Sequence, residues 1–224
     1  LNSGNFNRYQ TNSRLYRVTS NGILLVLQDI PTKGARNAAF ISYDGGYYLI
    51  IANALDNSGN SRINTEMYKW DANSSLFSLP SWQSIATLGA ESVVVFEVEG
   101  TKYLAVANNY DSVDKSYQLE SVVYKLGANS EFSQYQRIAT MGCQAIRFLQ
   151  IQSLNLLVFV NNRDNTVSSP QNSLVYRWDT LTQSFILHQR LETNRAEDVT
   201  VFKAYDDTVN LAFANGIGNS VIFV

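Results

Sequence analysis

The side chains with the chemistry for catalysis are few in this sequence, and none stands in a recognisable catalytic pattern. His188 is the only histidine and Cys143 the only cysteine. A nucleophile needs a base within hydrogen-bond reach, and no Ser or Cys motif supplies a partner for His188. We interpret His188 as a structural filler beside a recurring glutamine, and Cys143 as a small buried residue in the place of an alanine. The sequence therefore predicts a protein that is not an enzyme.

Other polar groupings have simpler structural explanations. Asp206 and Asp207 suggest paired carboxylates, but they stand where other copies of the same segment have a tight turn. Residues 56–60, Asp-Asn-Ser-Gly-Asn, carry the oxygen ligands of a calcium loop without its bidentate glutamate. Gly216 and Gly218 lack the strand and helix that flank a dinucleotide site. We expect turns and loops at these places, with no metal and no cofactor.

The composition is that of a globular chain without an obvious charged partner. Its 224 residues are 45% hydrophobic, 12% aromatic and 16% charged, which is enough apolar material for a packed core. The formal net charge is -2 and like charges do not cluster, so nucleic acid is not an expected partner. The longest apolar runs are far shorter than the roughly 20 residues of a membrane helix, so we expect no membrane insertion.

The elements that must position any site come from an internal repeat with three markers. These are a tyrosine (Tyr16, Tyr68, Tyr124, Tyr176, then Phe223), a glutamine (Gln28, Gln83, Gln136, Gln189) and an asparagine (Asn53, Asn108, Asn161, Asn215). Successive glutamines lie 55, 53 and 53 residues apart, and successive asparagines 55, 53 and 54. A fixed period of this length is typical of propeller-like arrays.

Each period contains four short segments with apolar alternation, which predicts four antiparallel strands. The units cover about residues 13–53, 65–108, 121–161 and 173–215, with a terminal strand at 220–224. We predict one all-β domain over residues 1–224, a β-propeller of about four four-stranded blades. The segment after each Gly-Ala pair is rich in small and β-branched residues and is assigned as the innermost strand, A. Strand B follows, then C with the tyrosine and D with the glutamine.

The order of strands along the chain divides one blade. The sequence supplies strands C and D, then three complete sets, then A, B and C. We expect a blade to be shared between the two chain ends or between chains of a homo-oligomer. Phe223 is then surplus, because it competes with Tyr16 for one position.

Three linked motifs carry a family resemblance. They are Leu-Val-Tyr-Arg-Trp (174–178) and Glu-Met-Tyr-Lys-Trp (66–70), Tyr-Gln-Arg-Ile-Ala-Thr-Met-Gly (135–142) and Trp-Gln-Ser-Ile-Ala-Thr-Leu-Gly-Ala (82–90), and Tyr-Leu-Ala-Val-Ala-Asn (103–108). With them the chain resembles the EAR, or EPTP, repeats found in the leucine-rich glioma-inactivated proteins. The resemblance implies an extracellular, non-enzymatic β-propeller that binds other proteins. That family usually builds seven blades, so this chain is a smaller propeller, part of an oligomer or a piece of a larger ring.

The resemblance also implies a position for a channel ion. In the family, strand A usually begins with an aspartate after Gly-Ala, near the mouth of the channel. The corresponding residues here are Asn37, Ser92, Ala145 and Asp198. Only one is a carboxylate, and a hard cation wants six or more oxygen ligands, so we expect no metal there.

Binding capacity is expected where the repeats differ. The loops between strands B and C, at about residues 54–64, 109–120 and 161–172, are long, polar and dissimilar, and loops that diverge on a repeating scaffold commonly carry recognition. The candidates on these loops and on the neighbouring D-to-A corners are Tyr110, Asp111, Asp114, Tyr117, Arg163, Asp164, Arg36, Glu91 and Arg195. The alternative for each of them is an ordinary solvated loop residue.

Two functions follow from these observations. The first is a secreted module that recognises a protein partner or mediates adhesion through this loop surface. The second is a lectin, because repeated shallow pockets of Asn, Asp and aromatic residues suit weak multivalent glycan binding. Divergence among the loops favours the protein partner. A glycosylation sequon at residues 73–75, Asn-Ser-Ser, fits an extracellular location.

Overall fold

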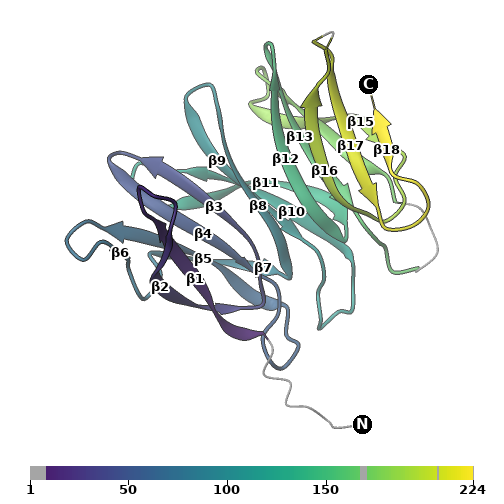
Figure 1. Ribbon diagram of the computed structural model, residues 1–224. Coiled ribbons are helices and arrows are strands. Elements are labelled where there is room, and N and C mark those ends of the chain that lie inside the picture. Colours follow the sequence, from purple (N-terminus) through teal and green to yellow (C-terminus); the bar gives the residue numbers. More distant parts are fainter. Residues whose placement is uncertain (1–8, 167–170, 206, 224) are drawn as a thin grey trace.

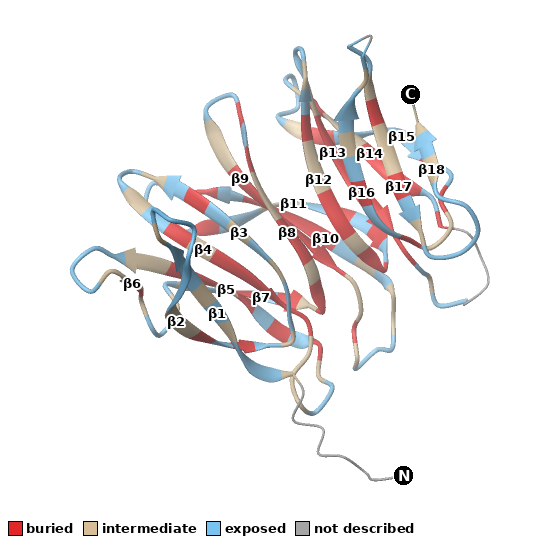
Figure 2. Ribbon diagram, in the orientation of Figure 1, coloured by how far each residue is buried: buried red, intermediate tan, exposed pale blue. Residues whose placement is uncertain are grey.

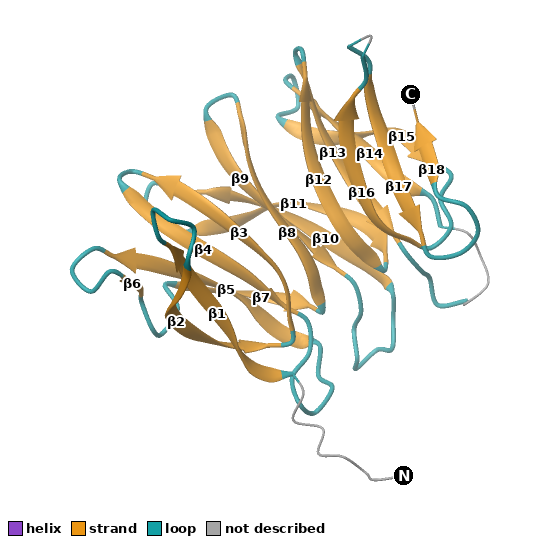
Figure 3. Cartoon of the chain, viewed as in Figure 1, coloured by secondary structure: helices purple, strands orange, loops and turns teal. Residues whose placement is uncertain are grey.

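The computed structural model describes residues 9–166, 171–205 and 207–223, and within these ranges the regular elements are all β-strands (Figure 1 and Figure 3). Four parts of the predictions lie outside the described residues: the start of the domain (1–8), part of the third loop (167–170), Asp206 in the turn and the last residue of the terminal strand (224). In the described part of the chain, no helix is long and apolar enough to cross a membrane. The prediction of an all-β protein is confirmed.

The strands are grouped into five antiparallel sheets. They are β1 (Gln10–Val18) and β2 (Leu24–Lys33); β3 (Ala35–Tyr43), β4 (Gly46–Asn53), β5 (Arg62–Asp71), β6 (Leu76–Phe77) and β7 (Gln83–Leu88); β8 (Ala90–Val98), β9 (Thr101–Asn108), β10 (Gln118–Leu126) and β11 (Phe132–Met141); β12 (Cys143–Ile151), β13 (Leu154–Asn161), β14 (Ser173–Asp179) and β15 (Ser184–Leu191); and β16 (Ala196–Lys203), β17 (Val209–Asn215) and β18 (Val221–Phe223).

The sheets follow the predicted order of strands. The second, third and fourth sheets each run A, B, C, D, while the first holds only C and D and the fifth only A, B and C. The A strands β3, β8, β12 and β16 each contact the A strand of the neighbouring sheet. They are therefore innermost, and the array has the blade arrangement of a propeller (Figure 1).

Three strands depart from a simple repeat of the predicted units. Strand D of the second sheet is divided into β6 and β7, which both pair with β5 and flank Pro80. Proline has no N–H to give to a ladder, which explains the break. The C strands β5 and β10 begin three residues before the predicted units at 65–108 and 121–161, because their first residues pair with the ends of the D strands.

At three of the four steps from a D strand to the A strand of the next sheet a single residue lies between them, whereas residues 192–195 separate β15 from β16. At three corners this residue is Gly34, Gly89 or Gly142, with φ of 56°, 56° and 51°. A Cβ atom on Gly142 would lie 2.7 Å from the carbonyl oxygen of Arg163. The corner therefore requires glycine, both for the left-handed backbone and for the close approach of the neighbouring loop.

The core is divided into layers between successive sheets, where Figure 2 shows the buried residues on the central strands. Neighbouring residues of one strand face opposite sheets. Ile50 packs with Leu104 of the third sheet, whereas Ile51 packs with Ile30 of the first. Consecutive buried residues such as these explain why the B strands read as continuous apolar runs.

The recurring glutamine of strand D joins its sheet to the next one. Gln136 donates from Nε2 to the carbonyl of Phe185 at 2.7 Å, and its Oε1 accepts from the Phe185 N–H at 2.9 Å. The same pair of bonds joins Gln83 to Phe132 and Gln28 to Phe77, at 2.7 to 2.9 Å. Each phenylalanine lies in strand D of the following sheet, 49 residues further along the chain. We call this arrangement the glutamine clamp.

A β-bulge precedes the clamp in each of the three uninterrupted D strands with a C-strand partner. In the fourth sheet Val175 pairs with Gln189 and Tyr176 pairs with Leu187, so His188 is the extra residue. Leu27 and Tyr135 have the same place in the first and third sheets. Bulges re-aim neighbouring side chains, so His188 has a structural position beside the recurring glutamine, with its side chain exposed.

The recurring asparagine at the end of strand B bonds two other segments, the end of the preceding D strand and the start of the following C strand. The Oδ1 of Asn108 accepts from the N–H of Leu88 at 3.0 Å, and its Nδ2 donates to the carbonyl of Glu120 at 2.8 Å. Asn53, Asn161 and Asn215 make the equivalent two bonds. The marker residues of the sequence are thus scaffold residues.

The first and fifth sheets lie at opposite ends of the array (Figure 1). Phe223 of β18 packs edge-on against Phe213 with ring centroids 5.7 Å apart, as Tyr176 does against Phe159 at 5.7 Å. It therefore occupies the tyrosine position of the fifth sheet, while Tyr16 occupies that of the first.

Candidate functional site

The loops between strands B and C and the D-to-A corners lie on one face of the array, which we call the loop face (Figure 3). The main-chain N–H of Ala54 donates to the carbonyl of Gly34 at 3.1 Å, and the same bond joins Asn109 to Gly89 and Asn162 to Gly142 at 3.1 Å. Each loop is thereby fixed to its own corner. Because β5 and β10 start early, the first two loops are shorter than predicted and cover residues 54–61 and 109–117.

An aspartate stands near the start of each of these loops and forms its turn. Oδ1 of Asp56 accepts from the N–H of Ser58 at 2.9 Å, Oδ1 of Asp111 from Val113 at 3.0 Å, and Oδ1 of Asp164 from Thr166 at 2.8 Å. Asparagine and aspartate commonly make such turns with the residue two positions on. Asp111 and Asp164, both candidates for binding, therefore have a structural role in their turns.

The second loop is also held by Arg62, the first residue of β5 in the preceding sheet. Its guanidinium binds Asp111 at 2.8 Å and Asp114 at 2.8 Å. The hydrogen bond from Arg62 is the largest cause that lowers the pKa of Asp111 below its usual range. Asp111 is buried and Asp114 is exposed, so the ion pair is anchored on one side and open on the other. Asp111 is therefore committed to holding the loop, whereas Asp114 remains accessible from solvent.

Five of the candidate residues come together in one pocket of about 350 Å³ on the loop face. They are Arg36, Glu91, Tyr110, Tyr117 and Arg163, and the rest of the lining is Ala54, Leu55, Gly89, Asn109, Gln144 and Glu197. We call this hollow the corner pocket. Asp111, Asp114, Asp164 and Arg195 do not line it.

One side of the corner pocket is charged. Arg36 Nε lies 3.4 Å from Glu91 Oε1, and Gln144 Nε2 donates to Glu91 Oε2 at 3.5 Å. The side chain of Glu91 is 15% exposed, against 44% for Arg36. Burial raises the pKa of Glu91, an effect that Arg36 opposes and the carboxylate of Glu197 reinforces. The pair can therefore offer a partner either an exposed guanidinium or a partly desolvated carboxylate.

The other side of the corner pocket is a stack of flat side chains. The rings of Tyr110 and Tyr117 are 4.7 Å apart between centroids, and Arg163 Cζ lies 5.3 Å from the Tyr117 centroid. Guanidinium and aromatic faces attract each other and hold each other in place. The N–H of Tyr117 donates to Oδ1 of Asn165 at 2.7 Å, so the second and third loops are also joined through the main chain.

Arg195 lies at a corner, as predicted, but outside the corner pocket. It occupies the corner between the fourth and fifth sheets with φ of 51°, where the other corners have glycine. Its carbonyl accepts from Nδ2 of Asn162 at 3.1 Å and from the N–H of Gly216 at 2.9 Å. Arg195 therefore shapes a corner outside the corner pocket.

Sequence reasoning missed Leu55, Asn109, Gln144 and Glu197. A signal for two of them was present, because Arg36, Glu91, Gln144 and Glu197 are spaced 55, 53 and 53 residues apart and each is the second residue of an A strand. Leu55, Tyr110 and Arg163 form a second such series, spaced 55 and 53. The corner pocket is thus lined by two sets of equivalent positions whose members differ in chemistry.

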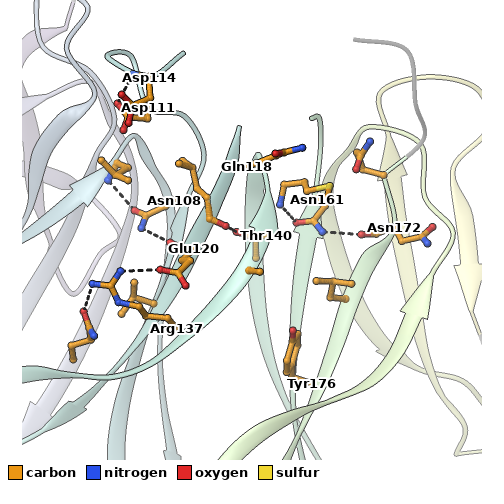
Figure 4. Close-up of a pocket in the computed structure, with 18 of the residues that line it drawn as sticks. Asn108, Asp111, Asp114, Gln118, Glu120, Arg137, Thr140, Asn161, Asn172 and Tyr176 are labelled. Atoms are coloured by element: carbon orange, nitrogen blue, oxygen red, sulfur yellow. Dashed lines mark hydrogen bonds and ion pairs between the residues drawn. The ribbon is translucent and has the colours of Figure 1, made fainter. Parts of the chain in front are cut away.

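A larger groove of about 920 Å³ lies among the outer parts of the second to fourth sheets, lined mainly by the third (Figure 4). Its polar side chains largely bind the scaffold. Asn108 and Asn161 make the repeated asparagine bonds, and Arg137 Nη1 binds Glu120 Oε2 at 2.8 Å. Because these residues hold strands together, the groove is a weaker candidate for recognition than the corner pocket.

The residues considered for catalysis and metal binding are dispersed. Cys143 is fully buried as predicted, and burial raises the pKa of its thiol to about 12. Asp207 is in the A-to-B turn and pairs with Lys203 at 2.6 Å. Within residues 9–166, 171–205 and 207–223, no three His, Cys, Asp or Glu side chains are grouped as for a metal ion. The A-strand positions Asn37 and Ser92 instead accept hydrogen bonds from the next sheet, from the N–H groups of Val93 and Ile146.

Comparison with known proteins gives the same repeat. A family model described as the EPTP domain matches residues 25–71 and 131–179. The mouse (Mus musculus) thrombospondin-type laminin G domain and EAR repeat-containing protein is 29% identical over 167 residues, 74% of this chain and 24% of that protein. The human (Homo sapiens) protein of the same name is 31% identical over 151 residues, 67% of this chain and 22% of that protein.

The chain thus spans about a quarter of the length of these curated relatives. Among solved structures, an exo-β-1,3-galactanase from Phanerochaete chrysosporium with β-1,3-galactotriose has a TM-score of 0.50 at 13% identity, over 94% of this chain and 49% of that one. At this identity the likeness concerns the fold alone. The family model, the two relatives and the repeated four-stranded sheets agree that the chain belongs to the EAR (EPTP) repeat family.

Proposed function

We propose that this protein is an extracellular, non-enzymatic module that recognises another protein through the corner pocket. The observation that carries the proposal is the convergence of Tyr110, Tyr117 and Arg163 beside the Arg36–Glu91 pair on the loop face. The names of the relatives, which join EAR repeats to a thrombospondin-type laminin G domain, support an extracellular setting. The chain covers only part of those proteins, so adhesion by a larger assembly belongs to the same proposal.

The chemistry of the corner pocket suits a protein surface of mixed character. Tyrosine and arginine are the residues that most often carry the energy of protein interfaces, because they bury large area and form directed hydrogen bonds. Arg163 is held on Tyr117, so little side-chain freedom is lost when a partner binds. Arg36 and Glu91 add charges of both signs at the rim. We expect a partner loop with an apolar or aromatic side chain flanked by an acidic residue.

The lectin alternative predicts a repeated site with the same residues in each copy. The equivalent positions Leu55, Tyr110 and Arg163 differ in size, charge and hydrogen-bonding capacity, as do Arg36, Glu91 and Gln144. A unique site favours one protein partner, whereas multivalent glycan binding depends on copies of one site. This difference supports the first hypothesis over the second.

The proposal is tested with the full chain on an array of recombinant extracellular protein domains and, in parallel, on a glycan array. Tyr117→Ala and Arg163→Ala are compared with Leu181→Ala, an exposed residue in a C-to-D turn away from the loop face. We expect binding to a protein domain that each loop-face variant weakens at least about tenfold, the loss typical of a hot-spot residue, while Leu181→Ala binds as wild type. Binding to glycans alone, or equal binding by all variants, overturns the proposal.

A further inference from the structure

The turn between β5 and β6 in the second sheet carries a modification motif that the corner pocket does not use. Residues 73–75 read Asn-Ser-Ser, and this is the one Asn-X-Ser/Thr triplet in the sequence. Such a triplet is the acceptor for an N-linked glycan, which is bulky and hydrophilic and therefore needs a surface position. Because triplets also arise by chance, the structure around Asn73 decides whether the fold accommodates a glycan there.

The side chain of Asp71, and not that of Asn73, holds this turn. Oδ1 of Asp71 accepts from the N–H of Asn73 at 3.1 Å, and Oδ2 accepts from the N–H of Ser74 at 3.3 Å. Asn73 is exposed, and its side-chain amide makes no hydrogen bond to any described residue. A glycan on Nδ2 therefore displaces no interaction that shapes the turn.

The position of Asn73 faces solvent in the other sheets as well. Each C-to-D turn of the second, third and fourth sheets has a residue in the left-handed region two residues before the clamped phenylalanine: Ser75 (φ 56°), Ser130 (63°) and Gln183 (52°). Asn73 stands two residues before this point, where the other two turns have Ala128 and Leu181. Leu181 is 92% exposed, and Ala128 is exposed too. The backbone of the repeat thus directs this position into solvent.

Asparagines one position later in the equivalent turns are engaged. Oδ1 of Asn21 accepts from Oγ1 of Thr19 at 2.5 Å, and Nδ2 of Asn129 donates to Oε2 of Glu131 at 2.7 Å. Neither asparagine begins a triplet with Ser or Thr in third place. An acceptor triplet and an amide without a described partner therefore occur together at Asn73.

We propose that Asn73 is modified with an N-linked oligosaccharide. The proposal rests on the extracellular setting of the proposed function, because the transferase and its donor belong to the secretory pathway. The donor is an oligosaccharide joined through C1 to a lipid pyrophosphate. Nδ2 of Asn73 forms a bond to C1, the bond from C1 to the pyrophosphate oxygen breaks, and the lipid pyrophosphate leaves with the electron pair. Nδ2 loses one proton to a base of the transferase, which recognises the triplet through the hydroxyl of Ser75.

A glycan on Asn73 leaves the corner pocket accessible. β5 has ten residues and runs from Arg62, which binds the second loop on the loop face, to Asp71 at the turn. Such a strand spans about 30 Å, and Figure 1 shows the β6 end of the second sheet projecting away from the loops. Gln183 donates to Glu99 at 2.9 Å, so a C-to-D turn of one sheet lies beside an A-to-B turn of another on this second face. The glycan keeps that face in solvent while the loop face contacts a partner.

The site is tested on the full chain, secreted from cultured animal cells behind a signal peptide. We expect one glycan that a peptide N-glycosidase removes, with conversion of Asn73 to aspartate detected by mass spectrometry. Asn73→Gln should abolish the glycan. Ser75→Gln should do the same without disturbing the turn, because Gln183 already has this left-handed position in the fourth sheet. Ser74→Ala keeps the triplet and should keep the glycan.

A transplanted triplet separates failure of the site from failure of the cells to glycosylate the chain. Leu181→Asn/Gln183→Ser creates a second acceptor triplet at the equivalent turn and should add a second glycan. A glycan on this variant at the new triplet alone, with none on Asn73, overturns the proposal. So does a secreted chain that has no glycan in either form, or a glycan that remains in Asn73→Gln.

The placement of the glycan and the recognition of a partner have separate readouts. Labelling with phenylglyoxal, followed by mass spectrometry, reports whether Arg36 and Arg163 in the corner pocket are accessible. We expect the same labelling rate before and after removal of the glycan, and protection of Arg163 by the glycan would overturn its placement away from the corner pocket. On the array of protein domains, Asn73→Gln should bind as wild type does. A glycosylated chain that binds no protein domain would count against the proposed function alone.

Discussion

The glutamine clamps and the corner pocket are built from the same repeat, yet they use repetition in opposite ways. Around Gln28, Gln83 and Gln136 each copy has the same residue, the same partner type and the same spacing of 49 residues. On the loop face the equivalent positions are Leu55, Tyr110 and Arg163, and the copies share only the backbone. The clamps define how sheets stack, whereas the corners present different chemistry at fixed places.

The difference separates two kinds of marker in a repeat. A residue that recurs with its partner is part of the scaffold, as the asparagine between Leu88 and Glu120 is. A position that recurs while its residue changes is available for recognition, provided that the backbone holds it. Asp111 shows that a place on the loop face is not sufficient evidence for recognition. It lies on that face, but it forms the same turn as Asp56 and Asp164 in the other copies.

The largest effect on the scaffold side is expected for Trp178→Ala. Trp178 is buried in the layer between the third and fourth sheets and packs edge-on against the clamped Phe185 at 5.1 Å. Removing a buried tryptophan leaves a cavity and should lower the free energy of unfolding by about 3–5 kcal/mol. Chemical denaturation measures this, with Trp82→Ala as the control; Trp82 is 41% exposed and should cost about 1 kcal/mol. Similar losses for the two variants would contradict the assigned packing of strand C.

The corners sharpen the comparison through Gly142→Ala and Arg195→Gly. The first places a Cβ atom 2.7 Å from a main-chain oxygen at φ of 51°, and should lower the free energy of unfolding by about 2–4 kcal/mol. The second relieves a left-handed conformation but makes the unfolded chain more flexible, so its net effect should stay within about 1 kcal/mol. Thermal unfolding of both variants measures the pair. A larger loss for Arg195→Gly would mean that its side chain, and not the corner backbone, holds this position.

Gln136, which makes the clamp, and Gln189, the equivalent residue of the fourth sheet, should differ in their effect on stability. Gln136→Ala leaves the N–H and carbonyl of Phe185 without their partner and should cost about 1–3 kcal/mol. Gln189→Ala removes no hydrogen bond to any described residue and should change the free energy of unfolding by less than about 0.5 kcal/mol. Urea unfolding of the two variants under one set of conditions decides the matter. Equal costs would show that the repeated glutamine acts through its packing and not through the clamp.

The smallest effect is expected from pH at the second loop. The hydrogen bond from Arg62 lowers the folded pKa of Asp111, so ionised Asp111 stabilises the fold above the unfolded pKa of about 3.9. This contribution is lost as pH falls through the lower folded pKa. Because Arg62 is 45% exposed, the contribution should stay below about 1 kcal/mol. Asp111→Asn should flatten the unfolding free energy against pH below about pH 4; curves that remain parallel to wild type would remove Asp111 from the acid response.

The fold could be predicted from the sequence to the level of strands and their order. Tyr, Gln and Asn recur because each makes the same local contacts in every copy, so their spacing reports the repeat directly. The limits of the C strands could not be predicted, because their first residues are polar and are paired only through neighbouring D strands. The division of β6 from β7 is equally non-local in origin, although Pro80 marked the place.

The sequence could predict which face of the molecule carries the candidate site, but not which residues of that face come together. Alignment of the copies places Arg36, Glu91 and the loop residues on one side, and five of nine candidates meet in the corner pocket. That Arg62 binds Asp111 depends on the approach of two loops whose sequences give no sign of it. Leu55 and Glu197 were missed because neither is exceptional until its equivalents are compared.

The one-residue link at three of the four D-to-A corners has a consequence for how such chains change length and specificity. Since Gly34, Gly89 and Gly142 leave no slack, the step from one sheet to the next has a fixed stride. Whole sheets can be added or removed in evolution without altering that spacing. Loops can likewise be exchanged between sheets, because each one starts and ends at equivalent positions. Insertions at these three glycine corners should be rejected, which directs sequence innovation there to the B-to-C loops and keeps each new recognition surface in register with the old ones.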